Sequence, residues 1–111
     1  MNILKTSREL TDEEVYLLCM QSSVNKMSDA EGQVLELDAW AYYEDVNARG
    51  ESNEVLAILT KDGDVFATIS NTFIKEFLKM AEHFNERLAK IKVITGTAKN
   101  GRQFVSCAYA K

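Results

Sequence analysis

Residues 33–44, QVLELDAWAYYE, alternate between two kinds of side chain. Leucine, alanine and tyrosine occupy one parity from Leu35 to Tyr43, whereas acidic side chains share the other parity with Trp40 and Tyr42. A period of two over this length predicts a half-buried β-strand. The two rings on the polar face leave two interpretations open. Either the strand bends and the rings pack under a loop or helix, or they form a platform on which flat ligands such as bases stack.

Turn signals and apolar runs predict four more strands, at Glu54–Thr60, Val65–Ile69, Lys90–Thr97 and Arg102–Tyr109. The pairs Asp62-Gly63 and Asn100-Gly101 are typical of hairpins, and the second pair fits a type I′ turn. Apolar residues at helical spacing predict a helix over residues 73–88. A capping box at Thr11 and Glu14 predicts a shorter helix that ends near Gln21. Residues 2–10 have no clear period.

The predicted order is therefore α-β-β-β-α-β-β, a mainly β fold with two helices. A helix between the third and fourth of five antiparallel strands is the order of the oligonucleotide/oligosaccharide-binding (OB) barrel. The length of 111 residues suits one domain. We expect residues 1–32 to form an N-terminal helical extension and residues 33–111 to form the barrel.

Composition narrows the class of protein. The hydrophobic fraction of 46% and charged fraction of 27% are typical of a globular protein. No membrane span or leader sequence is visible, so we expect a cytoplasmic protein without membrane contacts. Cys19 and Cys107 match no redox or metal spacing, and a lone His83 cannot build a metal site. No phosphate-binding glycine loop or nucleophile motif is present. We expect no enzyme, catalytic residue, metal or cofactor.

The net charge of −4 is unevenly distributed along the chain. Residues 1–74 hold five basic and fourteen acidic side chains, whereas residues 75–111 hold eight basic and three acidic ones. Such segregation can present a basic face on an acidic protein.

An OB barrel binds ligands through its strand 2–3 face and the loops that join strands 1–2 and 4–5. Those loops are residues 45–53 and 98–101 here. Rings that stack on bases and cations that pair with phosphates are the groups a single-strand binder needs. The candidate rings are Trp40, Tyr42, Phe66 and Phe104, and the candidate cations are Arg49, Lys92, Lys99 and Arg102. For each phenylalanine a place in the core is the alternative.

Three runs, EGQVLELDAWAYYED, VLAILTKDGDVFATISNTFIKEF and IKVITGTAKNGRQFVSCA, resemble a family of small single-stranded DNA-binding proteins from phages of Firmicutes. The similarity spans residues 28–111. It implies an OB-like fold, sequence-tolerant binding of single-stranded DNA, and a role in phage DNA replication or recombination in the host cytoplasm. A homo-oligomer and contacts with replication proteins are left open.

A protein-interaction module of phage origin, such as an inhibitor or adaptor of a host factor, is the alternative function. The position of the positive charge distinguishes the two. Cations that converge on the same face as Trp40 and Tyr42 favour nucleic acid, whereas rings within an acidic surround favour a protein partner.

Overall fold

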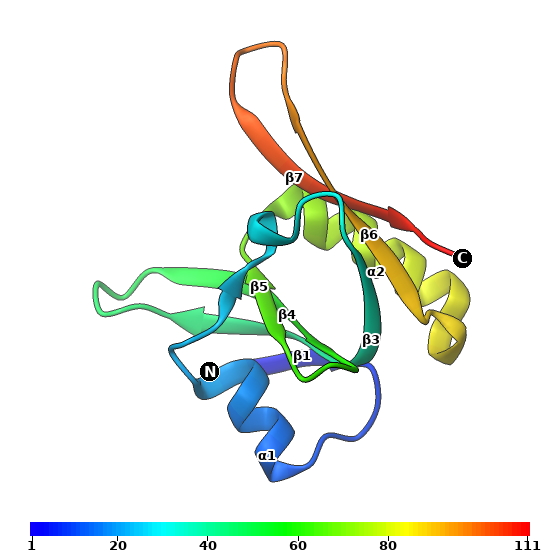
Figure 1. Ribbon diagram of the computed structural model, residues 1–111. Helices are drawn as coiled ribbons and strands as arrows, with labels where there is room; N and C mark the ends of the chain where they lie inside the picture. The colour runs from blue at the N-terminus through cyan, green and yellow to red at the C-terminus, as the bar shows by residue number, and fades with distance from the viewer.

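One long strand, β3 (Val34–Val46), pairs with three others. One edge pairs with β4 (Ser52–Thr60) from Leu37 to Val46. The other edge pairs with β6 (Lys90–Thr97) near the start of β3 and with β1 (Asn2–Thr6) near its end. Figure 1 shows β3 curving between these partners in the computed structural model, which describes residues 1–111 except the side chain of Glu86.

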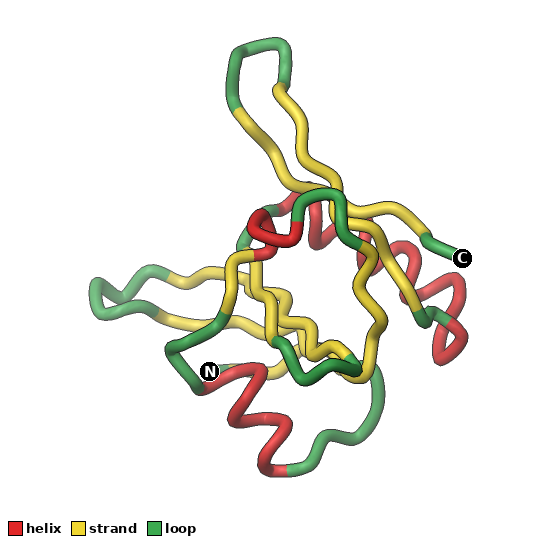
Figure 2. Tube along the Cα trace, viewed as in Figure 1, coloured by secondary structure: helices red, strands yellow, loops and turns green.

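The strand order across the sheet is β2-β5-β4-β3-β6-β7, where β2 is Asn25–Lys26, β5 is Val65–Thr68 and β7 is Gln103–Tyr109. The helix α2 (Asn71–Phe84) lies between β5 and β6 in the sequence. The predicted mainly β fold, with its β-β-β-α-β-β order of OB type, is therefore confirmed. The sheet curls into a half-barrel, and α2 lies against β7 (Figures 1 and 2).

Two strands were not predicted. In β1, which pairs antiparallel with β3, four of the five residues are exposed, and the register shifts between Ile3 and Lys5. An exposed edge strand with a register shift needs no alternation of apolar residues, which explains why the sequence gives no period there. The two-residue strand β2 pairs parallel with β5. Residues expected to precede the barrel thus pair with two of its strands.

An extra residue in β3 changes which side chains share a face. Leu37 pairs with Thr60 and Ala39 with Leu59, so Asp38 has no opposite residue and forms a β-bulge. Leu37 consequently lies in the same buried cluster as Trp40, whereas Ala39 belongs to the cluster on the other face. The uninterrupted alternation predicted for residues 35–44 is wrong for this reason.

The inner cluster holds the rings expected on the polar face of β3. Trp40 is only 6% exposed, and its ring meets the ring of Phe77 edge to face at 5.2 Å. Phe73 and Phe77 of α2 are fully buried beside it. Ser70 caps the helix by accepting a hydrogen bond from the amide of Phe73. The first interpretation of the rings, packing under a helix, is confirmed for Trp40.

The outer face of β3, β4 and β5 is covered by the N-terminal helix, residues 12–20. This helix begins as α1 (Asp12–Val15) behind the predicted capping box and continues as one π-helical segment, Tyr16–Met20. Leu18 is 1% exposed and packs in a cluster with Ala39, Ala57, Leu59 and Val65 of the three strands. The outer face of β4 and β5, where an OB barrel would bind its ligand, is therefore occupied by the chain itself.

Three hairpins share one kind of turn. In each five-residue loop, the amide of the first residue donates to the carbonyl of the fifth, and the amide of the fourth donates to the carbonyl of the first. The loops are Asn47–Glu51, Thr60–Asp64 and Ala98–Arg102. The fourth residue is glycine with a φ of 81°, 91° or 82°, as in a type I turn followed by a left-handed residue. Asn85 is the one non-glycine residue with positive φ in the described chain, so the expected type I′ turn at Asn100 is wrong.

Among the described residues, no helix combines the length and the apolar character needed to cross a membrane.

The N-terminal helix should contribute to the stability of the whole fold. Leu18→Ala removes a fully buried side chain, and we expect it to lower the free energy of unfolding by about 2–5 kcal/mol. Met20→Ala is the matched control, because Met20 lies two residues away and is 66% exposed. Urea unfolding followed by circular dichroism measures both. If Leu18→Ala and Met20→Ala have the same free energy of unfolding, the helix is only loosely attached to the sheet.

Candidate nucleic-acid interface

The hairpin of β6 and β7 projects from the barrel as an arm, which we define as residues 92–104 and call the β6–β7 arm (Figure 1). Val93 and Cys107 form one cross-strand pair and are buried in the inner cluster. The neighbouring pairs have the opposite parity and turn Lys92, Ile94 and Phe104 to the outer face. All three side chains are exposed. The register of one hairpin thus gathers a cation and two apolar side chains on one surface.

Phe104 lies across the sheet from a glycine. It pairs with Gly96, and a methyl group placed on Gly96 would lie 2.7 Å from Cζ of Phe104. The ring therefore covers the glycine backbone, an arrangement that stabilises a glycine within a strand. Phe104 remains 39% exposed. The close contact at Gly96 is thus made by this ring, which packs against the glycine backbone.

The tip of the arm holds the two other cations. Lys99 and Asn100 are the central residues of the turn, and Arg102 follows Gly101. The amide of Arg102 donates to Oδ1 of Asn100 at 3.0 Å. This hydrogen bond fixes the backbone at the point where Arg102 leaves the turn. Lys99 and Arg102 are both exposed. The turn type differs from the predicted one, but it still places both cations at the tip.

The two long hairpins carry opposite charge. The β6–β7 arm contains three basic residues and no acidic one. The hairpin of β3 and β4, residues 42–54, contains four acidic residues and one basic residue, Arg49. The two hairpins point in different directions from the barrel (Figure 1). The positive potential should therefore be concentrated along one arm, where it can attract phosphates despite the net negative charge of the chain.

The other four predicted residues lie away from this arm. Trp40 is buried, and Phe66 is half-buried against the inner cluster. Arg49 is exposed at the tip of the acidic hairpin. The Tyr42 hydroxyl donates to the carboxylate of Glu54, and this hydrogen bond is the main reason that the pKa of Tyr42 rises to about 12. The structure thus groups Lys92, Lys99, Arg102 and Phe104, but it does not group them with Trp40 or Tyr42.

Ile94 was not predicted as a site residue. It shares the outer face with Lys92 and Phe104 and is 38% exposed. The signal was present in the sequence, because Lys92, Ile94 and Gly96 have the same parity in the predicted strand. This shared parity alone places Ile94 on the same face as Lys92.

Comparison with known proteins assigns the chain to a family. A family model described as phage single-stranded DNA-binding protein matches residues 2–109. The chain belongs to this family. The match takes in β1 and the N-terminal helix as well as the barrel. No match was found among curated proteins or solved structures.

The contact of Phe104 with Gly96 should be visible in solution. A ring stacked over a glycine shifts the Hα resonances of that glycine upfield, and we expect such a shift for Gly96 in the proton NMR spectrum. Phe104→Ala should remove it. Ile94→Ala, on the same face of the arm, should leave it in place. Gly96 resonances at ordinary positions in the wild-type protein would show that the ring does not cover the glycine.

Proposed function

We propose that this protein binds single-stranded DNA on the outer face of the β6–β7 arm, without strong preference for sequence. Phe104 offers a flat surface to a base, while Lys92, Lys99 and Arg102 pair with phosphates along the strand. Any base can stack on an aromatic ring and every nucleotide carries a phosphate, so this combination tolerates all sequences. The role we infer is support of phage DNA replication or recombination in the host cytoplasm.

The observation that carries the proposal is the gathering of an exposed ring and three cations on one arm without acidic residues. Membership in the phage single-stranded DNA-binding family supports the same conclusion. Arg49 contributes less in this proposal, because acidic side chains surround it in the sequence and would repel a phosphate. Tyr42 and Phe66 have structural roles.

The acidic hairpin suggests a second candidate function, contact with a protein. Its apolar Val46 is 58% exposed and lies among Glu44, Asp45 and Glu51. One exposed apolar side chain is ordinary on a protein surface, but the four acidic residues of this hairpin would attract a partner with a basic surface. Replication proteins and a second copy of this chain are both candidate partners of this kind. Such contact is compatible with DNA binding on the other arm.

Salt dependence tests the phosphate contacts. Three cations on single-stranded DNA predict a slope of about −2 for log K against log salt concentration, at roughly −0.7 per contact. Lys99→Ala/Arg102→Ala should weaken the binding of oligo-dT and reduce the magnitude of this slope by about 1.4. Both side chains are exposed, so the fold should survive. Fluorescence anisotropy of a labelled oligonucleotide measures affinity and slope.

The matched control is Lys75→Ala/Lys79→Ala, which removes two exposed positive charges from α2. In this control, the slope of log K against log salt concentration should remain within about 0.3 of the wild-type value. Salt screens charges that do not contact the DNA, so a change in the net charge of the protein alone has a weak effect. Wild-type affinity and slope in the double variant of the arm would mean that the arm does not contact phosphate.

Stacking is tested separately through Phe104. Phe104→Ala should lose about 1–3 kcal/mol of binding free energy for oligo-dT, roughly 5- to 150-fold in affinity. Phe104→Tyr keeps the ring and should stay within about threefold of wild type. The salt slope should stay unchanged in both variants, because no charge is removed. An alanine variant with wild-type affinity would exclude this ring as a stacking surface.

A further inference from the structure

A cavity lies at a gap in the sheet, away from the outer face of the arm. Along one edge of β3, pairing with β6 stops at Glu36 and pairing with β1 begins at Ala41. Between them, Leu37 donates its amide to the carbonyl of Ala89, and Trp40 exchanges hydrogen bonds with Ser7. The edge thus forks around residues 37–40. The end of α2 covers the inner side of this fork.

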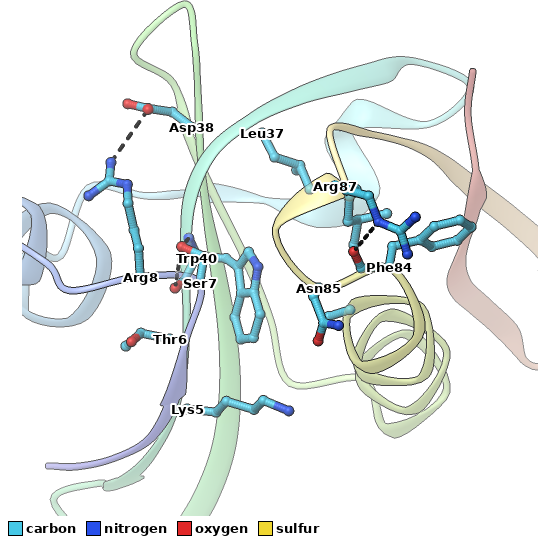
Figure 3. Close-up of a pocket in the computed structure, with 12 residues that line it drawn as sticks. Lys5, Thr6, Ser7, Arg8, Leu37, Asp38, Trp40, Phe84, Asn85 and Arg87 are labelled. Atoms are coloured by element: carbon cyan, nitrogen blue, oxygen red, sulfur yellow. Dashed lines mark hydrogen bonds and ion pairs between the residues drawn. The ribbon is translucent and has the colours of Figure 1, made fainter.

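The cavity has a volume of about 840 Å³, within the range of small-molecule sites. Its walls come from three parts of the chain: the end of β1, the bulged part of β3 and the end of α2. Figure 3 shows the Trp40 ring between the β1 side, which carries Lys5, and the helix side, which carries Asn85. Aromatic and amide groups therefore border the same space.

The charge around the cavity favours an anion. Lys5, Arg8 and Arg87 line it, and Asp38 is the one acidic residue among the described lining side chains. Asp38 is 3.4 Å from Arg8, which also forms a two-bond ion pair with Glu14 at 2.6 and 2.9 Å. Arg8 holds the pKa of Glu14 down at about 2, so the carboxylate remains charged. With Asp38 paired to Arg8, Lys5 and Arg87 are left to attract a ligand.

Arg87 and Asn85 partly offset the negative charge at the C-terminal end of α2. Arg87 donates from Nε to the carbonyl of Phe84 at 3.3 Å, and the amide of Asn85 donates to the carbonyl of Ala81. Both bonds satisfy carbonyls that would otherwise repel an anion near this helix end.

Asn85 has an unusual backbone conformation, with φ 53° and ψ −130°. This region is favoured by glycine and costs free energy in other residues. Asn85 ends α2 there and borders the cavity. A side-chain amide both donates and accepts hydrogen bonds, as the edge of a nucleic-acid base does. The chain thus keeps an amide, in a position that glycine would occupy at lower cost, beside an aromatic and cationic cavity.

We propose that this cavity binds one unstacked nucleotide, with its base beside Trp40 and Asn85 and its phosphate near Lys5 and Arg87. The inference rests on the proposed function, because the nucleotide would belong to the bound single strand. The start of β6 adjoins the cavity wall at Arg87 and Leu88, and β6 runs from there into the arm. Its seven residue steps span about 23 Å. One strand of DNA can therefore engage both sites.

The combination of groups favours a nucleotide over a peptide. The small exposed part of the Trp40 ring can contact a base, and one anionic group matches the two cations at the rim. An extended peptide would need a free strand edge or a long groove. At the fork, Leu37 and Trp40 already use their backbone groups with Ala89 and Ser7.

Trp40 is the only tryptophan in the chain, so its fluorescence reports on this cavity. Full-length protein is titrated with thymidine 5′-monophosphate, with inorganic phosphate, with a Glu-rich peptide and with labelled oligo-dT, whose binding is followed independently by anisotropy. We expect saturable quenching of Trp40 by the monophosphate and by oligo-dT. We expect little change with phosphate alone or with the peptide.

Three variants sharpen the test. Lys5→Ala/Arg87→Ala should weaken monophosphate binding about tenfold or more, whereas Lys75→Ala/Lys79→Ala, with the same loss of charge on α2, should bind as wild type. Asn85→Gly removes the amide and relieves the backbone conformation. It should weaken monophosphate binding while the midpoint of urea unfolding stays equal or rises. A merely structural role for Asn85 would leave the affinity unchanged.

The outcomes separate this inference from the proposed function. Anisotropy that reports oligo-dT binding while Trp40 emission stays constant would overturn the cavity site and leave DNA binding on the arm intact. Quenching by the monophosphate without oligo-dT binding would support the cavity site and refute the proposed function. A response to the Glu-rich peptide alone would make the cavity a peptide site and contradict the inference.

Discussion

The bulge at Asp38, which has no opposite residue on β4, sets the arrangement of the rest of the molecule. Because one residue is added there, Trp40 turns inward to meet Phe77, and Ala39 turns outward toward Leu18. Each face of the strand then has a helix to cover it. The same bulge lies where pairing along the edge of β3 passes from β6 to β1, so the curvature of the sheet and its fork share one origin.

The order of the elements could be predicted from the sequence, because apolar periods and glycine turns are local signals. The face of the sheet on which each side chain of β3 lies could not be predicted. A bulge shifts the period by one residue, and QVLELDAWAYYE reads as an unbroken alternation whether or not Asp38 is paired. β1 also escaped prediction, since its exposed residues need no apolar pattern. The N-terminal helix was predicted from its capping box, but its position depends on packing against strands far along the chain, as in the buried cluster that holds Leu18 and Leu59.

The candidate interface was partly predictable for the same reason. Lys92, Lys99, Arg102 and Phe104 lie within one hairpin, whose register follows from its turn, so local reasoning placed them together. Trp40, Tyr42 and Phe66 depend on the parity of β3 and β5 relative to the core, which the bulge and the inward packing decide. The cavity could not be predicted from the sequence, because its walls come from the end of β1, the bulged part of β3 and the end of α2, which lie far apart along the chain.

The opposite charges of the two hairpins give the molecule an electric dipole moment. A protein with net charge −4 is repelled as a whole by DNA, yet the field of the DNA exerts a torque that turns the basic arm toward the strand and the acidic hairpin away from it. Orientation before contact raises the fraction of collisions that lead to binding, and the net repulsion limits non-productive adhesion. For the proposed binding of DNA on the arm, the uneven charge would therefore act on the rate of association as well as on its strength.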